Sequence, residues 1–523
     1  MRLKQPVLLT FFFILATIPL IFGARHPLVH GLYSFCLLIA GGIWLVLNFA
    51  ENKKRLVSFN SLAPLAIIIF IVVSALPLPL FLVRLLSPVR AENLAAAGRI
   101  AQLHDLVTSL SYYAPGSMFY AIYGLALFFF FLAFSTLLRS AENRRRTLWI
   151  ITIVGVFEAV YGLLQATNPA LGVLWLPSDI SSRGCARGTI IYRNQYAAFL
   201  NMCWPMAFVL GISLYKPVLT KLEFLRKQKN KLSIADRIEF LFHKATVPFW
   251  SGAFMILALI FSRSRGGIVV MLILAGLMIF LLPFSRRSKI LSISLLSLFI
   301  FVYGGMIGFQ VVTNRFMFFY NSALFRFHLW FVSLAMLKDH LVTGIGMGSY
   351  QFLSPVYLKD VPDRVWFDHA HNEYVEMAIE LGLPAMLLFM AWLVRGMTGY
   401  WRQIMQSEKT AAEVQSAQIV AIGAFCGISG FLLHAAVDFI WRLPANVIYA
   451  VALLALLNAA SKQKKSYKFT STSSSPPLAS SHPPRIDSEA QTNEPKALVN
   501  SYGLSISRGC RHLVNCYKKI RQR

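Results

Sequence analysis

The sequence predicts an all-α membrane protein, a polytopic bundle of about twelve transmembrane helices. Of its 523 residues, 57% are hydrophobic and only 14% are charged, and the mean hydropathy is +0.60. A soluble domain of this size needs a more polar surface. The apolar residues also form blocks of about 20, which are long enough to cross a bilayer as helices. Blocks such as residues 290–303 do not alternate between polar and apolar, so we expect helices rather than barrel strands.

The predicted spans follow one another along most of the chain. They cover residues 6–23, 28–50, 62–83, 117–138, 147–166, 194–215, 248–262, 266–284, 290–311, 383–400, 416–436 and 443–460. The first block lacks a small-residue cleavage site before Arg25. We therefore expect a retained anchor rather than a signal peptide that is removed.

The formal net charge of +28 predicts the orientation of the bundle. Dense basic clusters, such as Lys53-Lys54-Arg55 and residues 144–146, fall in alternate loops. Basic loops stay in the cytoplasm, so both termini are predicted to be cytoplasmic, with anionic membrane lipid as a partner. The sequence has no basic and aromatic module for nucleic acid. We therefore expect no nucleic acid as a partner. The six cysteines match neither a zinc nor a disulfide pattern, so we expect no bound metal.

Three segments lie outside the predicted spans. Residues 84–116 and 312–382 form long loops on the outer face. Loops of that length without a domain of their own are usually functional or disordered, and the closely spaced glycines of the second favour order. Residues 461–523 begin with a stretch rich in Ser, Thr, Pro and Lys, which predicts a disordered, basic cytoplasmic tail.

The first candidate site is the turn Arg263-Ser264-Arg265-Gly266-Gly267 between two predicted spans on the outer face. Two arginines beside paired glycines suit a tight turn whose backbone approaches an anion. Arginine binds phosphate in a bidentate manner and never loses its charge. A simple interfacial anchor is the alternative. Since arginine is otherwise sparse on this face, we favour a functional turn.

The second candidate site runs from Asp368 to Gly382 at the end of the long outer loop. Asp368 is expected to cap a helix that stops at Gly382. Glu373, Glu376 and Glu380 are spaced i, i+3 and i+7, so they are expected to share one face of that helix.

The two histidines of this segment, His369 and His371, allow three interpretations. A histidine can act as a general base near neutral pH. The pair beside carboxylates can also ligate a metal, or each ring can be a structural group with satisfied hydrogen bonds. The spacing alone leaves all three open.

Other polar residues are predicted at the same face. They are Arg183, Arg187 and Arg193 before Asn194, Arg326 and His328 beside Trp330, and His434 with Asp438 and Arg442. The three loop arginines would attract a polyanion, or they are ordinary exposed charges. Asp438 and Arg442 are four residues apart, and an ion pair explains them. Glu158 lies inside a predicted span and needs a partner that the sequence does not identify.

Together these motifs resemble the O-antigen ligase and polymerase superfamily. The resemblance covers roughly residues 150–450, and no P-loop, Rossmann or zincin motif competes with it. It rests on Ser-Arg-Gly-Gly at 264–267, His-x-His-Asn-x-Tyr at 369–374, Glu-x-Gly at 380–382, Gly-Thr to Asn at 188–194, Arg-x-x-x-Trp at 326–330 and Gly-x-Gly at 344–346.

The resemblance implies a GT-C-like, metal-independent transferase without cofactors in the bacterial inner membrane. Residues 1–146 would be N-terminal helices, and 147–460 the catalytic region that includes the periplasmic loop 312–382. The donor would be a glycan on undecaprenyl diphosphate. The acceptor would be a hydroxyl of lipid A-core or of another glycan.

The resemblance also implies roles for individual residues. Arg265 and Arg193 would hold the diphosphate, and His371 would be the base or would orient the acceptor hydroxyl. The other expected substrate-binding residues are Arg263, Arg326, His369, Asn372, Glu380 and Asp438. Among these, Arg263 and His369 have the least defined roles.

Several functions compete with an O-antigen ligase. A polysaccharide polymerase and a protein O-oligosaccharyltransferase belong to the same family and differ in the acceptor. A transporter or flippase would instead need polar groups around Glu158 at the bilayer midplane. A structural subunit of an envelope assembly would leave the candidate residues dispersed. A cavity surrounded by Arg193, Arg265 and His371 would indicate a transferase.

Overall fold

A computed structural model of the chain shows a bundle of long helices. It describes residues 4–52, 62–102, 108–177, 184–229, 243–307, 324, 326–358, 368–406 and 412–472. Within these residues the regular structure is helical, apart from one isolated bridge between Val173 and Leu176. The predicted all-α class is therefore confirmed. The described residues up to Ser471 belong to one compact unit.

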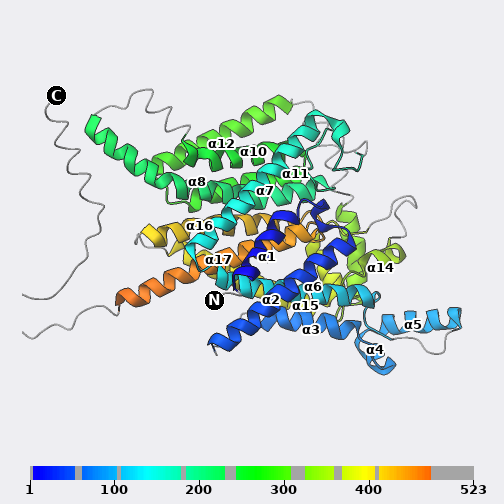
Figure 1. Ribbon diagram of the computed structural model, residues 1–523. Coiled ribbons are helices and arrows are strands. Elements are labelled where there is room, and N and C mark those ends of the chain that lie inside the picture. Colours follow the sequence, from blue (N-terminus) through cyan, green and yellow to red (C-terminus); the bar gives the residue numbers. More distant parts are fainter. Residues whose placement is uncertain are drawn as a thin grey trace, which may run out of the picture. The chain divides into compact units, whose positions relative to one another are not determined.

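The long helices coincide with the predicted spans (Figure 1). They are α1 (Lys4–Thr17), α2 (Pro27–Asn52), α3 (Leu62–Ala75), α6 (Ala114–Leu137), α7 (Ala141–Thr167), α8 (Arg193–Lys229), α10 (Val247–Phe261), α11 (Arg265–Leu281), α12 (Arg286–Ile307), α15 (Glu373–Met405), α16 (Ala412–Ala435) and α17 (Pro444–Thr472). Shorter helices are α4 (Leu80–Leu86), α5 (Pro88–Ala101), α14 (Tyr350–Tyr357) and residues 326–339, with 3-10 turns η1 (Phe22–Ala24), η3 (Pro169–Leu171) and η5 (Lys244–Thr246).

Eight helices of the described residues are long and apolar enough to cross a bilayer unaided: α2, α6, α7, α8, α10 with η5, α15, α16 and α17. The apolar helices α1, α3 and α11 are shorter. The chain is thus a multi-pass membrane protein, as predicted.

Some predicted boundaries were wrong. The predicted span 62–83 is two helices, because Pro77 and Pro79 follow α3 and remove the backbone donors that a continuous helix needs. The predicted span 383–400 is the second half of α15, which starts before it and bends at Gly382, where φ is 76°. Helix α17 continues past the predicted end at 460, into the predicted tail. The remainder of that tail, 473–523, lies outside the described residues.

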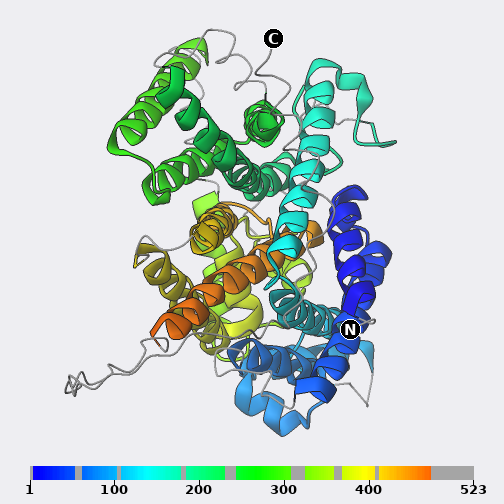
Figure 2. The same cartoon turned by 60° about the vertical axis from the view of Figure 1, so that its left-hand side comes forward.

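Helix α17 lies between the N-terminal helices and α8 (Figures 1 and 2). The Tyr449 hydroxyl donates to the carbonyl of Leu15 on α1 at 2.7 Å. On its other side, the Tyr449 ring packs 4.7 Å from the ring of Phe199 on α8. All three residues are fully buried. The apolar core is therefore continuous from the first helix to the last.

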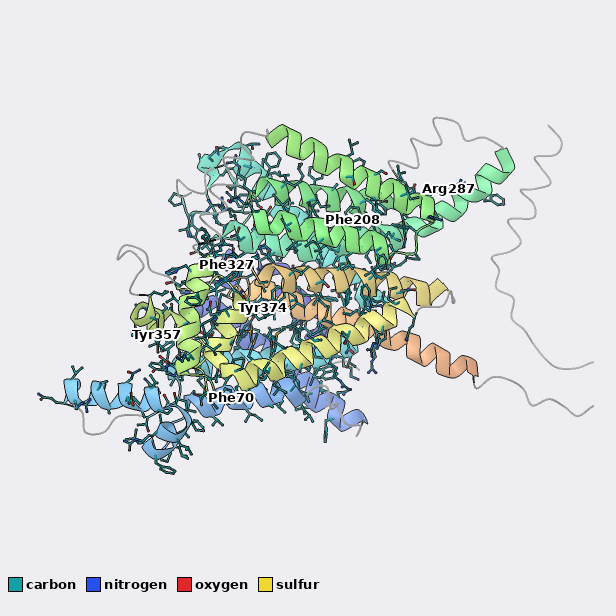
Figure 3. All side chains as sticks on the ribbon, turned by 180° about the vertical axis from the view of Figure 1, so that it is seen from behind. Phe70, Phe208, Arg287, Phe327, Tyr357 and Tyr374 are labelled. Carbon is teal, nitrogen blue, oxygen red and sulfur yellow. The ribbon has the colours of Figure 1, made fainter. Side chains whose placement is uncertain are left out.

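The two ends of the bundle differ in what they carry. Figure 3 shows Phe327, Tyr357 and Tyr374 at one end and Arg287 at the other. Helices α8, α11, α15 and α17 start at the first end, which we call the His371 end. The end with Arg287, where α12 begins, is called the Arg287 end. The candidate site residues belong to loops and helix starts of the His371 end.

Candidate functional site

The histidine segment turns sharply just before α15. Asn372 caps this helix: its side-chain oxygen accepts from the backbone N–H groups of Tyr374 and Val375, at 3.0 and 3.2 Å. The expectation that Asp368 is the cap was wrong, because the helix starts later, at Glu373. His371 adopts a left-handed backbone with φ of 52°. Such a conformation is strained for a residue with a side chain, and strained residues cluster at functional sites.

Asp438 joins three segments that are far apart in the sequence. Its carboxylate lies 3.4 Å from Nδ1 of His371 and 3.8 Å from a guanidinium nitrogen of Arg326. The Asn194 side chain, in the first turn of α8, donates to the same carboxylate. The Asp438 side chain is only 3% exposed, whereas that of His371 is 29% exposed. A substrate can therefore reach the imidazole while the carboxylate behind it stays covered.

The charge state of Asp438 follows from these neighbours. Burial raises the pKa of this carboxyl, but the nearby His371 and the positive charge of Arg326 outweigh burial and bring the pKa below its ordinary value. Asp438 is thus an ionised carboxylate near neutral pH. The predicted Asp438–Arg442 ion pair was wrong, since residues 436–443 are not helical and Arg442 contacts other carboxylates.

Arg442 lies among three buried glutamates of α15. Its guanidinium is 2.6 Å from Glu376 and 2.7 Å from Glu380, and its Nε is 3.9 Å from Glu373. The predicted common face of the three glutamates is confirmed. Burial lowers the pKa of Arg442, but the carboxylates of Glu376 and Glu380 outweigh burial and hold it well above its ordinary value. This cluster could not be predicted from local patterns, because Arg442 follows the glutamates by some sixty residues.

Glu376 links this cluster to the histidine segment. One of its oxygens lies 2.9 Å from Nδ1 of His369, and the other accepts from the backbone N–H of Ala370 at 2.9 Å. The Phe439 ring stacks on His369 at 4.8 Å and meets His371 edge-on at 4.9 Å. The two histidines therefore pair with different carboxylates. Among the described residues no group of three or more His, Cys, Asp or Glu is arranged to hold a metal.

The turn 264–267 is held against neighbouring helices. Ser264 caps α11 by accepting from the backbone N–H of Gly267 at 3.3 Å. A Cβ on Gly266 would lie 3.2 Å from Val437 and 3.4 Å from His434, and a Cβ on Gly267 would lie 2.5 Å from Ala197. The paired glycines thus permit close packing of α11 on α8 and on the segment before Asp438. This packing brings Arg265 to the end of the bundle that carries Asp438.

Three predicted arginines are exposed near this turn, namely Arg193, Arg263 and Arg265. Arg193 opens α8 directly before Asn194 and lies 3.8 Å from the sulfur of Cys185. Arg263 has a left-handed backbone, and its guanidinium lies beside Gly184. Exposed guanidinium groups at one end of a membrane bundle can bind a phosphate-bearing ligand.

The helix 326–339 fixes both the histidine segment and Asp438. Arg326 donates to the carbonyl of Val437 at 2.7 Å, and the Trp330 indole donates to the carbonyl of Ala370 at 2.9 Å. These residues are one helical turn apart and face the same way. The Arg-x-x-x-Trp pattern therefore has a structural basis in these two contacts.

Two predicted substrate-binding residues, Glu380 and Asn372, have contacts within the protein. Glu380 is 1% exposed, and its second oxygen accepts from the backbone N–H of Tyr350 at 3.1 Å. Close packing continues at Gly344, where a Cβ would lie 2.4 Å from the carbonyl of Glu380. The side-chain oxygen of Asn372 accepts the two hydrogen bonds that cap α15. Both carboxylate oxygens of Glu380 and the side-chain oxygen of Asn372 thus have partners within the protein.

Other polar candidates are buried or lie outside the described residues. Glu158 is fully buried and accepts from the backbone N–H and the hydroxyl of Thr189, at 2.8 and 2.6 Å. Arg187 is 4% exposed and donates to the carbonyl of Ile191. His434 is 1% exposed. Arg183 lies outside the described residues.

A large cavity is lined in part by residues of α15. Glu373, Trp441 and Arg442 are part of its wall, but Arg193, Arg265 and His371 are not. The expected arrangement, in which these three residues surround one cavity, does not apply to this cavity. At the His371 end, Arg193 and Arg265 are exposed and His371 is partly exposed.

The comparisons with known proteins agree with these motifs. Residues 250–390 match the family model described as O-Antigen ligase. The match runs from α10 through the bend of α15, so it includes both the 264–267 turn and the histidine segment. It leaves out Asn194 and Asp438. A search of curated proteins found no match.

Proposed function

Because the chain belongs to the O-antigen ligase superfamily, we propose that it transfers a glycan from undecaprenyl diphosphate to an acceptor hydroxyl at the His371 end. Glycan transfer of the O-antigen-ligase type is the activity of the family. The observation that carries the proposal is the junction at Asp438, where His371, Arg326 and Asn194 meet within reach of one carboxylate.

In this proposal His371 takes the proton of the acceptor hydroxyl. The acceptor oxygen forms a bond to the anomeric carbon of the donor sugar while the bond from that carbon to the diphosphate oxygen breaks. The ionised Asp438 behind Nδ1 favours the tautomer with a proton on Nδ1, so that Nε2 is the base. General-base catalysis of this kind contributes about 10²–10⁴-fold in rate.

The diphosphate leaves with the electron pair of the broken bond, so negative charge develops on it in the transition state. Fixed cations stabilise this charge more than they stabilise the bound donor. We assign that role to the exposed Arg265 and Arg193, with Arg263 as a further contact. No metal is required in this scheme, because the arginines supply the positive charge.

The other predicted site residues act through positioning. His369, paired with Glu376, and Asn372, as the cap of α15, hold the backbone on both sides of His371. Glu380 fixes Arg442 and Tyr350. Arg326 orients Asp438 through the carbonyl of Val437 and the carboxylate itself.

We further propose that the His371 end faces the periplasm, with both termini in the cytoplasm of a bacterial inner membrane. The basic residues at the starts of α7 and α12, including Arg145 and Arg287, support this orientation by the positive-inside rule.

The same chemistry serves a ligase, a polymerase and a protein O-oligosaccharyltransferase, and we favour lipid A-core as acceptor over a glycan chain or a protein. A transporter is disfavoured. Its expected midplane site at Glu158 is a carboxylate engaged by Thr189, and Glu158 is not part of the wall of the cavity.

The test is an analysis of glycans in a strain that lacks this chain. Long glycans retained on the carrier lipid and missing from the surface indicate a ligase, whereas single repeat units on the carrier indicate a polymerase. Complementation with Arg265→Ala or His371→Ala is expected to restore insertion but not transfer. Near-normal surface glycan with either variant would refute the assignment.

A further inference from the structure

A cavity of about 1380 Å³ lies between α2, α3 and α6 on one side and α15, α16 and α17 on the other. Pockets for drug-sized ligands span about 300–1,000 Å³, so this cavity is larger than such ligands need. It is also separate from the junction at Asp438, which does not contribute to its wall.

The middle of the cavity wall is apolar. It is formed by Ile67, Ile71, Leu127, Phe131, Phe389 and Leu393. Helix α15 keeps this space open through two glycines, Gly396 and Gly399. A Cβ on either residue would meet no atom within 4 Å. The wall therefore suits hydrocarbon chains.

The two ends of the cavity differ in charge. At the His371 end, Arg442 and Glu373 close the cavity and lie 3.9 Å from each other. Towards the Arg287 end the wall contains Lys4, Arg139, Arg395 and Arg402. Among the described residues of the wall, Glu373 is the single acid. Lys4 has an interaction partner of its own. The Arg287 end of the cavity is thus positive, and its wall places no carboxylate beside Arg139, Arg395 and Arg402.

A buried polar atom lies close to these cations. The hydroxyl of Ser135 is buried and has no hydrogen-bond partner among the described residues. Ser135 is part of the wall and precedes Arg139 by one helical turn. A buried hydroxyl without a partner is costly, and a polar group of a bound molecule would satisfy it.

We propose that this cavity binds one anionic glycerophospholipid of the bilayer, with its phosphodiester at Arg139 and Arg402 and its acyl chains along the apolar wall. Basic pockets between transmembrane helices attract anionic headgroups. The ester region would lie near Ser135, and the chain ends would point towards Trp441. The proposal does not depend on the transferase assignment.

This lipid would not be the glycan donor. Its headgroup would lie towards the Arg287 end of the bundle, and His371 is not part of the cavity wall. Its chains would instead contact Glu373 and Arg442, which belong to the cluster that holds the histidine segment through Glu376. A bound lipid would therefore stabilise the cluster around Arg442 and, through Glu376, the histidine segment.

The preference for an anionic headgroup is tested by native mass spectrometry of the delipidated full-length protein. The probes are dioleoylphosphatidylglycerol and dioleoylphosphatidylcholine, which carry the same chains. We expect at least tenfold tighter binding of the anionic lipid. The double variant Arg139→Gln/Arg402→Gln is expected to lose this preference, while the control Arg286→Gln/Arg287→Gln, exposed at the same end and outside the wall, keeps it.

The proposed binding of the acyl chains is tested with a substitution that fills part of the cavity. Gly396→Phe places a ring in open space, and Gly276→Phe on α11 is the matched control, since a Cβ there also meets nothing within 4 Å and lies outside the wall. We expect at least a tenfold loss of phosphatidylglycerol binding for Gly396→Phe alone. Equal binding of both lipids, or equal binding by both phenylalanine variants, would overturn the proposal. So would retention of undecaprenyl phosphate in place of phosphatidylglycerol.

Discussion

Nδ1 of His371 lies 3.4 Å from Oδ1 of Asp438, although one residue precedes α15 and the other follows α16. The carboxylate is covered and the imidazole is accessible. In the proposed mechanism, Nε2 is the reactive nitrogen of the ring and Asp438 fixes its tautomer.

Asp438→Asn should therefore lower transfer by about 10²–10⁴-fold, which is the usual contribution of a general base, because the amide no longer stabilises a protonated imidazole. The measurement is single-turnover transfer from a purified lipid-linked donor. The control is Asp339→Asn, which changes an exposed carboxylate that accepts a hydrogen bond from the Tyr357 hydroxyl. This variant should retain activity. An unchanged rate for Asp438→Asn would remove this residue from the mechanism.

Glu376→Gln should lower kcat with little change in KM, because it disturbs the pair with His369 and the contact with Ala370 that shape the histidine segment. Glu373→Gln is the matched control. It alters another carboxylate of the Arg442 cluster, whose backbone contact is with Trp441. Equal kcat values for the two variants would contradict a positioning role for Glu376.

Arg442→Met should destabilise the protein by about 3–5 kcal/mol, because it leaves three buried carboxylates without their cation. The thermal midpoint of the detergent-purified protein measures the loss. Arg395→Met, at an exposed position of α15, should change the midpoint little. A midpoint for Arg442→Met as high as that of the control would show that the glutamates are satisfied by other groups.

The stability of the protein should also decrease in mild acid because of His340. Burial lowers the pKa of His340 from 6.5 to about 4, with a smaller opposing effect of Asp339 and a further lowering by Arg90. A histidine with a lowered folded pKa contributes its full stability above 6.5, and that stability is lost as the pH falls from 6.5 towards 4.

His340 contacts the hydroxyls of Ser87 and Tyr112 at 3.2 and 3.3 Å, so its protonation would disturb the packing of α5. Thermal midpoints of the wild type and His340→Gln between pH 7.5 and 4.5 test this. The midpoint of the wild type should fall more steeply over this range. Parallel curves would assign the acid sensitivity to other groups.

Composition and apolar block length were sufficient to predict the helical membrane fold, because lipid requires satisfied backbone groups and helices provide them locally. The spacing of Glu373, Glu376 and Glu380 likewise predicted a common face, since helical geometry determines it. The helix boundaries were less certain. Pro77 ended α3 earlier than hydropathy indicated, and Asn372 rather than Asp368 capped α15.

The sequence by itself determined the class of the protein and the identity of the polar residues near its His371 end. Only the tertiary structure decided which of them meet. It paired Asp438 with His371 rather than with Arg442, placed Arg442 among the glutamates, and engaged Glu158 with Thr189. These contacts join segments that only helix packing brings together, so local sequence patterns do not predict them.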